Sequence, residues 1–241
     1  MPANPRPVLE AVRAALQSEP HSDLHARQIA MDFADGTLVL AGEVGSIAAK
    51  KLALERAAAV PGVDSIADRL HVAPAQRMGD KEIRAHVCDA LLQEPAFLEF
   101  AIVQRHADRW ETVRALPRAR GSLDVEVTDG VVTLNGTVPG LDHKRLAGVL
   151  AWWVPGSRDV INGIAVDPPE DDSHEVITEA VRLVLEKDPF VNVSQLRVAS
   201  KDAVVTLRGL VRTEGERQMA ESDAWYVFGV DKVINQIEVR A

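Results

Sequence analysis

The sequence predicts an α+β protein of three tandem α-β-β-α-β modules, each a small mixed three-stranded sheet covered by two helices on one face. The first observation is a repeated apolar segment: GTLVLAGEV from Gly36, GVVTLNGTV from Gly130 and AVVTLRGLV from Ala203. The second is helical periodicity on both sides of each segment. The third is that all three copies keep one register from the turn to the last strand without a gap, which identifies an internal repeat.

Each copy opens with apolar residues at four-residue spacing, which predicts one buried face of an amphipathic helix. These residues are Val8, Val12 and Leu16; Ile83, Val87 and Leu91; and Ile177, Val181 and Leu185. A proline stands four residues after the last member of each set, at Pro20, Pro95 and Pro189. Because the residue before a proline disfavours the helical conformation, we expect each helix to end there.

A β-hairpin is expected next in each copy. Asp35-Gly36 and Asp129-Gly130 each lie between two runs with β-like alternation. Asp-Gly in this position indicates a tight turn, because the turn requires positive φ. The third copy has Asp202-Ala203 instead, so we expect a different turn type there.

A glycine recurs inside the second strand, at Gly42, Gly136 and Gly209. Glycine in a strand marks a bulge or the close approach of another backbone, so we expect a structural role and no ligand contact. A second helix follows, and then a last strand. The expected modules are residues 1–73, 79–168 and 172–241, separated by the polar, proline-bearing segments APAQRMGD and DPPEDDS.

The repeated motif resembles the BON domain, a module first named from bacterial osmotically inducible and nodulation proteins. The resemblance rests on D-G-x-V-x-L-x-G-x-V, here Asp129 to Val138, and on the later G-V before the last strand. The third copy departs at Ala203, and the second has Ser157 in place of the valine of G-V. The resemblance implies a module without known catalytic residues, often found on envelope proteins. It further implies association with anionic phospholipid in some members and potassium binding in one relative.

The composition is that of a globular protein, with 46% hydrophobic and 26% charged residues and a net charge of -9. A uniformly acidic surface repels nucleic acid and the anionic face of a membrane unless a local patch reverses the sign. No secretory signal and no membrane-spanning run is recognisable, so we expect a cytoplasmic protein, or a periplasmic one if the numbering is that of a mature fragment.

No enzyme chemistry is expected. The sequence has no P-loop, no nucleophile elbow and no dinucleotide fingerprint, and nothing implies a cofactor. His21 and His25 stand close together without a third ligand in reach, so no metal site is predicted. The single cysteine, Cys88, lies in an apolar helical stretch and is expected to act as a small hydrophobic residue. Glu170, Asp171 and Asp172 are interpreted as a solvated acidic linker.

The second copy carries an insertion near residues 100–120, because Pro95 and Gly136 are 41 residues apart, against 22 and 20 in the other copies. The insertion contains five arginines: Arg105, Arg109, Arg114, Arg118 and Arg120. The helical spacing of Phe100, Val103, Trp110 and Val113 suggests a basic amphipathic helix. The alternative is that its apolar side packs on the sheet while its arginines are solvated.

Paired aromatic residues mark the second helices, Trp152-Trp153 in copy two and Trp225-Tyr226 in copy three. They fall off the expected core face, which suits either packing between copies or contact with a partner. A basic residue also recurs near the start of these helices, at Lys50, Lys144 and Arg217. A shared anion site, solubility and a link to nearby carboxylates are all compatible with it.

The leading interpretation is a non-catalytic binding or scaffold protein in a bacterial stress or envelope context, engaging an anionic phospholipid surface or a protein partner through copy two. The alternative is a stress protein that binds a small ligand or a monovalent cation such as potassium. Candidate surface-binding residues are Arg105, Arg109, Arg114, Trp110, Trp152, Trp153, Trp225 and Tyr226.

Overall fold

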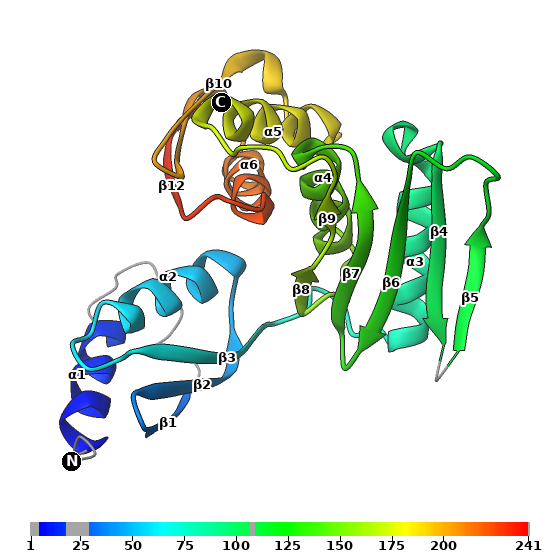
Figure 1. The fold of residues 1–241 in the computed structure, drawn as a ribbon. Coiled ribbons are helices and arrows are strands. Elements are labelled where there is room, and N and C mark those ends of the chain that lie inside the picture. The colour runs from blue at the N-terminus through cyan, green and yellow to red at the C-terminus, as the bar shows by residue number, and fades with distance from the viewer. Residues whose placement is uncertain (1–4, 18–28, 107–108, 241) are drawn as a thin grey trace. The chain divides into compact units, whose positions relative to one another are not determined.

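The computed structural model describes residues 5–17, 29–106 and 109–240. Within these residues the strands form three separate sheets, and no strand of one copy enters the sheet of another. The chain divides into two compact units, residues 1–73 and residues 74–241. The first unit holds module 1, and the second holds modules 2 and 3 packed together (Figure 1).

Module 1 follows the expected element order. Its elements are α1 (Pro5–Gln17), β1 (Ala30–Ala34), β2 (Thr37–Val44), α2 (Ile47–Ala58) and β3 (Ser65–Val72). β1 is antiparallel to β2, and β2 is parallel to β3, as a hairpin followed by a helical crossover requires. Its core residues Val12, Leu38, Leu40 and Leu70 are fully buried.

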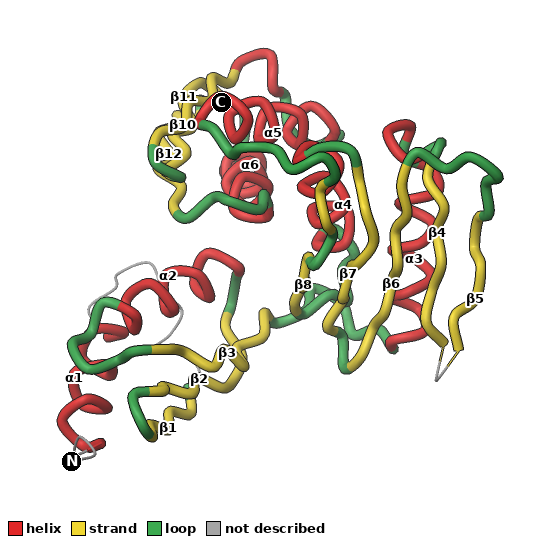
Figure 2. Tube along the Cα trace, in the orientation of Figure 1, coloured by secondary structure: helices red, strands yellow, loops and turns green. Residues whose placement is uncertain are grey.

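Module 3 repeats this plan. Its elements are α5 (His174–Lys187), η3 (Val193–Gln195), β10 (Leu196–Lys201), β11 (Val204–Val211), α6 (Glu214–Tyr226) and β12 (Lys232–Val239). β11 is the central strand, antiparallel to β10 and parallel to β12. Figure 2 marks the helices of each module in red and the strands in yellow. α5 and α3 (Asp80–Gln93) both end before the expected prolines, Pro189 and Pro95. Pro20, the proline expected to end α1, lies outside the described residues.

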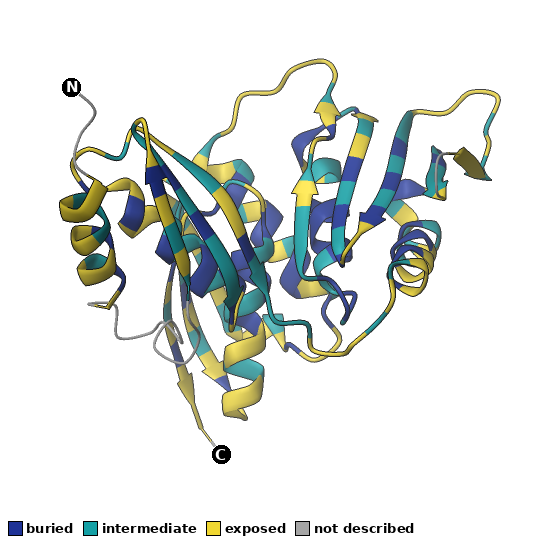
Figure 3. Ribbon diagram, turned by 90° about the horizontal axis from the view of Figure 1, so that it is seen from below, coloured by how far each residue is buried: buried dark blue, intermediate teal, exposed yellow. Residues whose placement is uncertain are grey.

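Module 2 keeps the plan and extends it. Its elements are α3 (Asp80–Gln93), η2 (Pro95–Phe97), β4 (Phe100–His106), β5 (Arg109–Arg114), β6 (Gly121–Thr128), β7 (Val131–Val138), α4 (Leu141–Trp152), β8 (Asp159–Asn162) and β9 (Ala165–Val166). The sheet has six strands in the order β5-β4-β6-β7-β8, with β9 also on β7. The expected three-stranded sheet is therefore wrong for this module. Figure 3 shows buried and exposed positions alternating along the strands.

The insertion is a pair of strands and not the expected amphipathic helix. β4 pairs in parallel with β6, and β5 pairs antiparallel with β4. The physical reason lies in β4, where Phe100 and Ile102 alternate with less buried neighbours and are themselves fully buried against the core. Period two outweighs the helical spacing because the edge of β6 offers backbone partners. The expectation that the apolar side packs on the module is confirmed for β4.

The third hairpin uses the same turn as the other two, so the expected change of turn type is wrong. Asp129 and Gly130 have φ of 52° and 77°, while Asp202 and Ala203 have φ of 50° and 60°. The backbone thus places an alanine in the left-handed region, at a steric cost that glycine avoids. The Asp202 amide donates to Nδ1 of His174 at 3.1 Å, which helps to hold the turn.

The three interior glycines share a positive φ. Gly42, Gly136 and Gly209 have φ of 141°, 117° and 140°. A Cβ at Gly136 would lie 2.1 Å from the carbonyl oxygen of Ser122 on the neighbouring strand, and one at Gly209 would lie 2.0 Å from that of Gln195. Any side chain there would have to displace the backbone of the partner strand.

Replacing Ala203 by glycine is expected to stabilise module 3, because it relieves an alanine held at positive φ. After the entropy that glycine loses on folding, the gain is about 0.5–1 kcal/mol. Urea denaturation of the two proteins measures it. Ala199→Gly, in β10, is the matched control and should lower stability. An Ala203→Gly variant no more stable than the parent would contradict the strained turn.

Replacing Gly136 by valine is expected to lower the stability of module 2 by about 3 kcal/mol or more, because it adds both strain and a backbone clash. Thermal unfolding measures the loss. Surface binding should persist at temperatures where the variant remains folded. Selective loss of binding with unchanged melting would mean that Gly136 contacts a ligand.

Candidate functional site

Trp110 on β5 is the most exposed of the candidate aromatic residues, at 52%. It pairs across the hairpin with Arg105 of β4, whose guanidinium carbon lies 6.0 Å from the indole centroid. Arg105 also forms an ion pair of 3.1 Å with Glu126 of β6. The stacked cation therefore stiffens Trp110 on the open sheet face, and its charge is partly neutralised.

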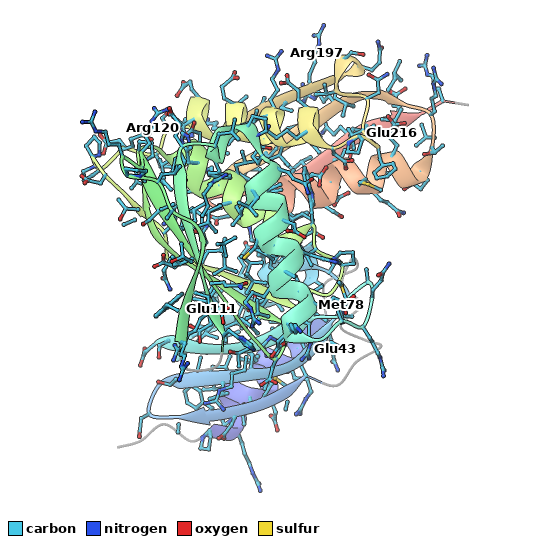
Figure 4. The ribbon with its side chains drawn as sticks, turned by 90° about the vertical axis from the view of Figure 1, so that its right-hand side faces the viewer. Glu43, Met78, Glu111, Arg120, Arg197 and Glu216 are labelled. Atoms are coloured by element: carbon cyan, nitrogen blue, oxygen red, sulfur yellow. The ribbon has the colours of Figure 1, made fainter. Side chains whose placement is uncertain are left out.

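The other two candidate arginines have different roles. Arg114 donates from Nε to the carbonyl of Phe100 at 2.9 Å and from Nη2 to the carbonyl of Phe97. It fixes the hairpin to the turn after α3 and is not available to a partner. Arg109 is exposed at the start of β5, and Arg118 and Arg120 are exposed in the following loop (Figure 4 labels Arg120).

Trp152, Trp153 and Tyr226 make contacts between modules 2 and 3. Trp152 of α4 stacks on Tyr226 of α6, with ring centroids 5.4 Å apart and planes at 14°. The Trp153 indole donates to Oδ1 of Asp223 at 2.8 Å. Trp225 is 3% exposed. The stacking of Trp152 on Tyr226 and the hydrogen bond from Trp153 to Asp223 therefore hold α4 and α6 together, whereas Trp110 is exposed on β5.

Arg145 lies at the centre of this interface and was not singled out from the sequence. Its side chain is 1% exposed. Nε donates to the carbonyl of Phe228 at 2.8 Å, and Nη2 contacts both carboxylate oxygens of Asp172 at 2.6 Å. A buried guanidinium requires such partners because an unpaired one is strongly destabilising. One side chain thus links α4, the linker and module 3.

The acidic linker is more than a solvated segment, which corrects the interpretation of Glu170 and Asp172. α2 and α6 begin after Ser46 and Thr213, whose side chains cap them. α4 begins after Gly140, which has no capping side chain. Oε2 of Glu170 accepts from the Leu141 amide at 2.8 Å instead. The carboxylate satisfies a free amide and suits the positive end of the helix dipole.

The recurrent basic residue meets a recurrent polar residue in the last strand. Lys50 is 5% exposed and forms an ion pair of 3.0 Å with Asp68. At the equivalent positions Asn162 donates to the carbonyl of Lys144 at 2.7 Å, and Asn235 donates to that of Arg217 at 3.2 Å. These contacts fasten each crossover helix to its last strand. The signal in the sequence was an aspartate or asparagine 26 residues after the interior glycine in all three copies, at Asp68, Asn162 and Asn235.

Two buried carboxyl groups meet below Trp153. Asp223 is 2% exposed and Asp188 is 6% exposed. Burial raises the pKa of Asp223 to about 8; the hydrogen bond from Trp153 opposes this rise, while the hydrogen bond and charge of Asp188 add to it. This raised pKa favours the protonated form of Asp223 in the folded protein at neutral pH. Burial raises the pKa of Tyr226, and the charge of Asp223 adds to this rise.

Cys88 is packed under the inserted strand. It is 4% exposed, and its Sγ lies 3.7 Å from Oε1 of Gln104 on β4. Burial raises its pKa to about 11, so the thiolate is scarce at neutral pH.

No group of three His, Cys, Asp or Glu side chains in residues 5–17, 29–106 and 109–240 is placed to hold a metal ion. His21 and His25 lie outside the described residues. None of the described helices combines the length and apolar content needed to cross a bilayer.

Three mixed sheets, each backed by two helices and repeated in one chain, define a tandem α+β repeat protein. The BON domain model matches residues 8–74, 112–168 and 173–241, together well over half of the chain. The chain belongs to the BON domain family. The second match begins within β5, because the insertion separates α3 from the hairpin that follows it in the other copies.

Similar proteins include an uncharacterised protein of Anaplasma centrale, 27% identical over 124 residues, which are 49% of this chain and 82% of that one. Two solved structures of CdsD, a structural protein of the type III secretion system of Chlamydia trachomatis, are 14% identical with a TM-score of 0.25. Each match covers 97% of this chain, and one of the two structures is of the C-terminal domain.

The buried carboxyl pair predicts a pH-dependent interface. Because the pKa of Asp223 rises from 3.8 unfolded to about 8 folded, the folded state holds a proton that the unfolded state lacks between these values. Stability from this group falls as pH rises from about 4 to about 8. Asp223→Asn removes the titration, so the variant should be more stable than the parent at pH 8, with the gap closing at pH 5.

Urea denaturation at pH 5, 6.5 and 8 measures this difference. Asp231→Asn, an exposed site in module 3, is the control and should show no such trend. A gap between Asp223→Asn and the parent that stays constant with pH would show that Asp223 is ionised in the folded protein.

Proposed function

We propose that this protein is a non-catalytic binding and scaffold protein in which module 2 contacts an anionic phospholipid surface through its inserted hairpin. The observation that carries the proposal is the exposed Trp110, stacked beside Arg105 on the outermost strand of the six-stranded sheet. Family membership supports a binding or scaffold role in general terms. Tryptophan and arginine together suit the interface between lipid headgroups and acyl chains.

The charge available to such a surface differs from that expected from the sequence. Arg114 is bound to main-chain carbonyls and Arg105 is ion-paired, whereas Arg109, Arg118 and Arg120 are exposed. Each arginine near an anionic membrane contributes about 1 kcal/mol, screened by salt. Three of them give weak, reversible and salt-sensitive attachment, which needs an inserted aromatic residue to reach useful strength.

The alternative to a lipid surface is a protein that binds to the same hairpin. β5 has one strand neighbour, β4, so it is an edge strand of the module 2 sheet. An edge strand offers main-chain groups to an added strand. Binding through β5 would depend on its backbone more than on arginine charge, so the two partners respond differently to charge reversal.

Co-sedimentation with phosphatidylglycerol-containing vesicles at low and physiological salt tests the lipid proposal. The parent protein should bind at low salt, less at physiological salt, and little to neutral vesicles. The variant Arg109→Glu/Arg118→Glu/Arg120→Glu and the variant Trp110→Ala should each lose most of the binding. Arg197→Glu/Arg208→Glu/Arg212→Glu, with the same charge change in module 3, is the matched control and should bind nearly as the parent does.

Absence of binding to anionic vesicles at both salt concentrations would sink the lipid proposal, as would equal losses in the hairpin variant and its control. A protein partner or a monovalent cation would then be the better candidate. Cation binding predicts a higher melting temperature in potassium chloride than in choline chloride, independent of vesicles.

A further inference from the structure

Module 3 has an open groove where module 2 holds its inserted strand. In module 2, β4 lies along β6, with Phe100, Ile102 and Gln104 paired to Gly121, Leu123 and Val125. In module 3 the strand equivalent to β6 is β10, and β11 is its one strand neighbour among the residues that the structure describes. The correspondence is fixed by the sheet: Leu123 faces Gly136 across the hairpin, and Leu196 faces Gly209.

The groove is a cavity of about 460 Å³ between α5 and β10. On the sheet side it is lined by Ser194 of η3 and by Leu196 and Val198 of β10. These three positions are equivalent to Gly121, Leu123 and Val125, with which β4 pairs in module 2. Leu123 and Val125 are fully buried beneath β4, whereas Leu196 and Val198 are only half-buried. Uncovered apolar side chains therefore mark the place of a missing strand.

The main chain of β10 is oriented to receive that strand. At the end of the groove the Ser200 amide donates to Oγ1 of Thr178 on α5, so this amide points away from β11. Because hydrogen-bonding directions alternate along a strand, the amide and carbonyl groups of Val198 and Leu196 point to the same side. They face the cavity.

The helix side of the groove differs from that of module 2 in charge. Cys88 lies five residues after Ile83 and contacts Gln104 of β4, and Arg182 lies five residues after Ile177. Leu92, which packs on the module 2 core, corresponds in the same way to Glu186. Arg182 and Glu186 form an exposed ion pair of 3.0 Å, with 59% and 44% of their side chains accessible. A strand that enters this groove would therefore meet the guanidinium of Arg182 at the position where Gln104 of β4 meets the thiol of Cys88 in module 2.

We propose that the groove between α5 and β10 binds an extended segment of a partner protein, which adds in parallel to β10. Its recognition pattern is apolar-x-apolar-x-acidic: two alternate apolar side chains take the places of Phe100 and Ile102, and a carboxylate meets Arg182. The main-chain bonds supply affinity, and the alternate side chains supply specificity. The charged rim, which includes the outward-pointing Arg197 (Figure 4), discourages indiscriminate pairing along this edge.

The chain itself supplies the probe. A labelled peptide covering Phe100–His106 with the change Gln104→Glu is titrated into the full-length protein, and fluorescence anisotropy gives its affinity. Saturable binding is expected, with hydrogen exchange slowed at residues 194–198. The same peptide with Gln104→Lys should bind more weakly, because its charge opposes that of Arg182.

Charge reversal in the protein completes the test. Arg182→Glu should weaken binding of the glutamate peptide at least about tenfold and strengthen binding of the lysine peptide. Arg208→Glu, an exposed arginine on β11, is the matched control and should change either affinity less than about twofold. Absence of saturable binding, protection outside β10 and its flanking residues, or equal effects of the two substitutions would each overturn the proposal.

Discussion

The unit formed by modules 2 and 3 depends on the buried guanidinium of Arg145. It joins α4 to the linker carboxylate of Asp172 and to a main-chain carbonyl after α6, so three segments must be in place before its charge is satisfied. Removing one partner of a buried pair costs about 3–5 kcal/mol. Since Asp172 keeps 38% of its side chain accessible, solvent shares in stabilising the pair and reduces that figure.

The rest of the interface follows from this anchor. With α4 held against α5 and α6, Trp152 of module 2 and Tyr226 of module 3 stack on one another. The carboxyl group of Asp223 is then enclosed beside Asp188, and this burial raises its pKa and favours the protonated form. Small modules bury too little surface to be robust alone, and sharing an interface offsets that deficit. The unit formed by modules 2 and 3 therefore holds the β4–β5 hairpin and the edge strand β10 in one compact structure.

Much of the fold was predictable because local rules governed it. The prolines that end α3 and α5, the Asp-Gly turns and the gap-free register all act within a few residues. The failures arose where tertiary contacts overrode a local pattern. β4 became a strand because the edge of β6 and the apolar face of α3 were open to it. Ala203 accepted a left-handed conformation because the remainder of its hairpin imposed it.

The candidate site was less predictable for the same reason. Periodicity placed Trp152 off the core face of module 2, but it could not show that Tyr226 of module 3 stacks on it. Arg145 stood in a helix among other polar residues with no pattern to mark its burial. Among the candidate arginines, only the three-dimensional structure distinguishes Arg114, which binds two carbonyls, from the exposed Arg109.

Hydrogen exchange of the full chain in increasing urea tests the central role of the interface most directly. If Arg145 fuses the two modules, β7 and β11 of the parent protein will lose protection at the same urea concentration. In Arg145→Met the two strands will lose protection at different urea concentrations. Loss of protection at distinct concentrations in the parent protein would show that modules 2 and 3 are independent.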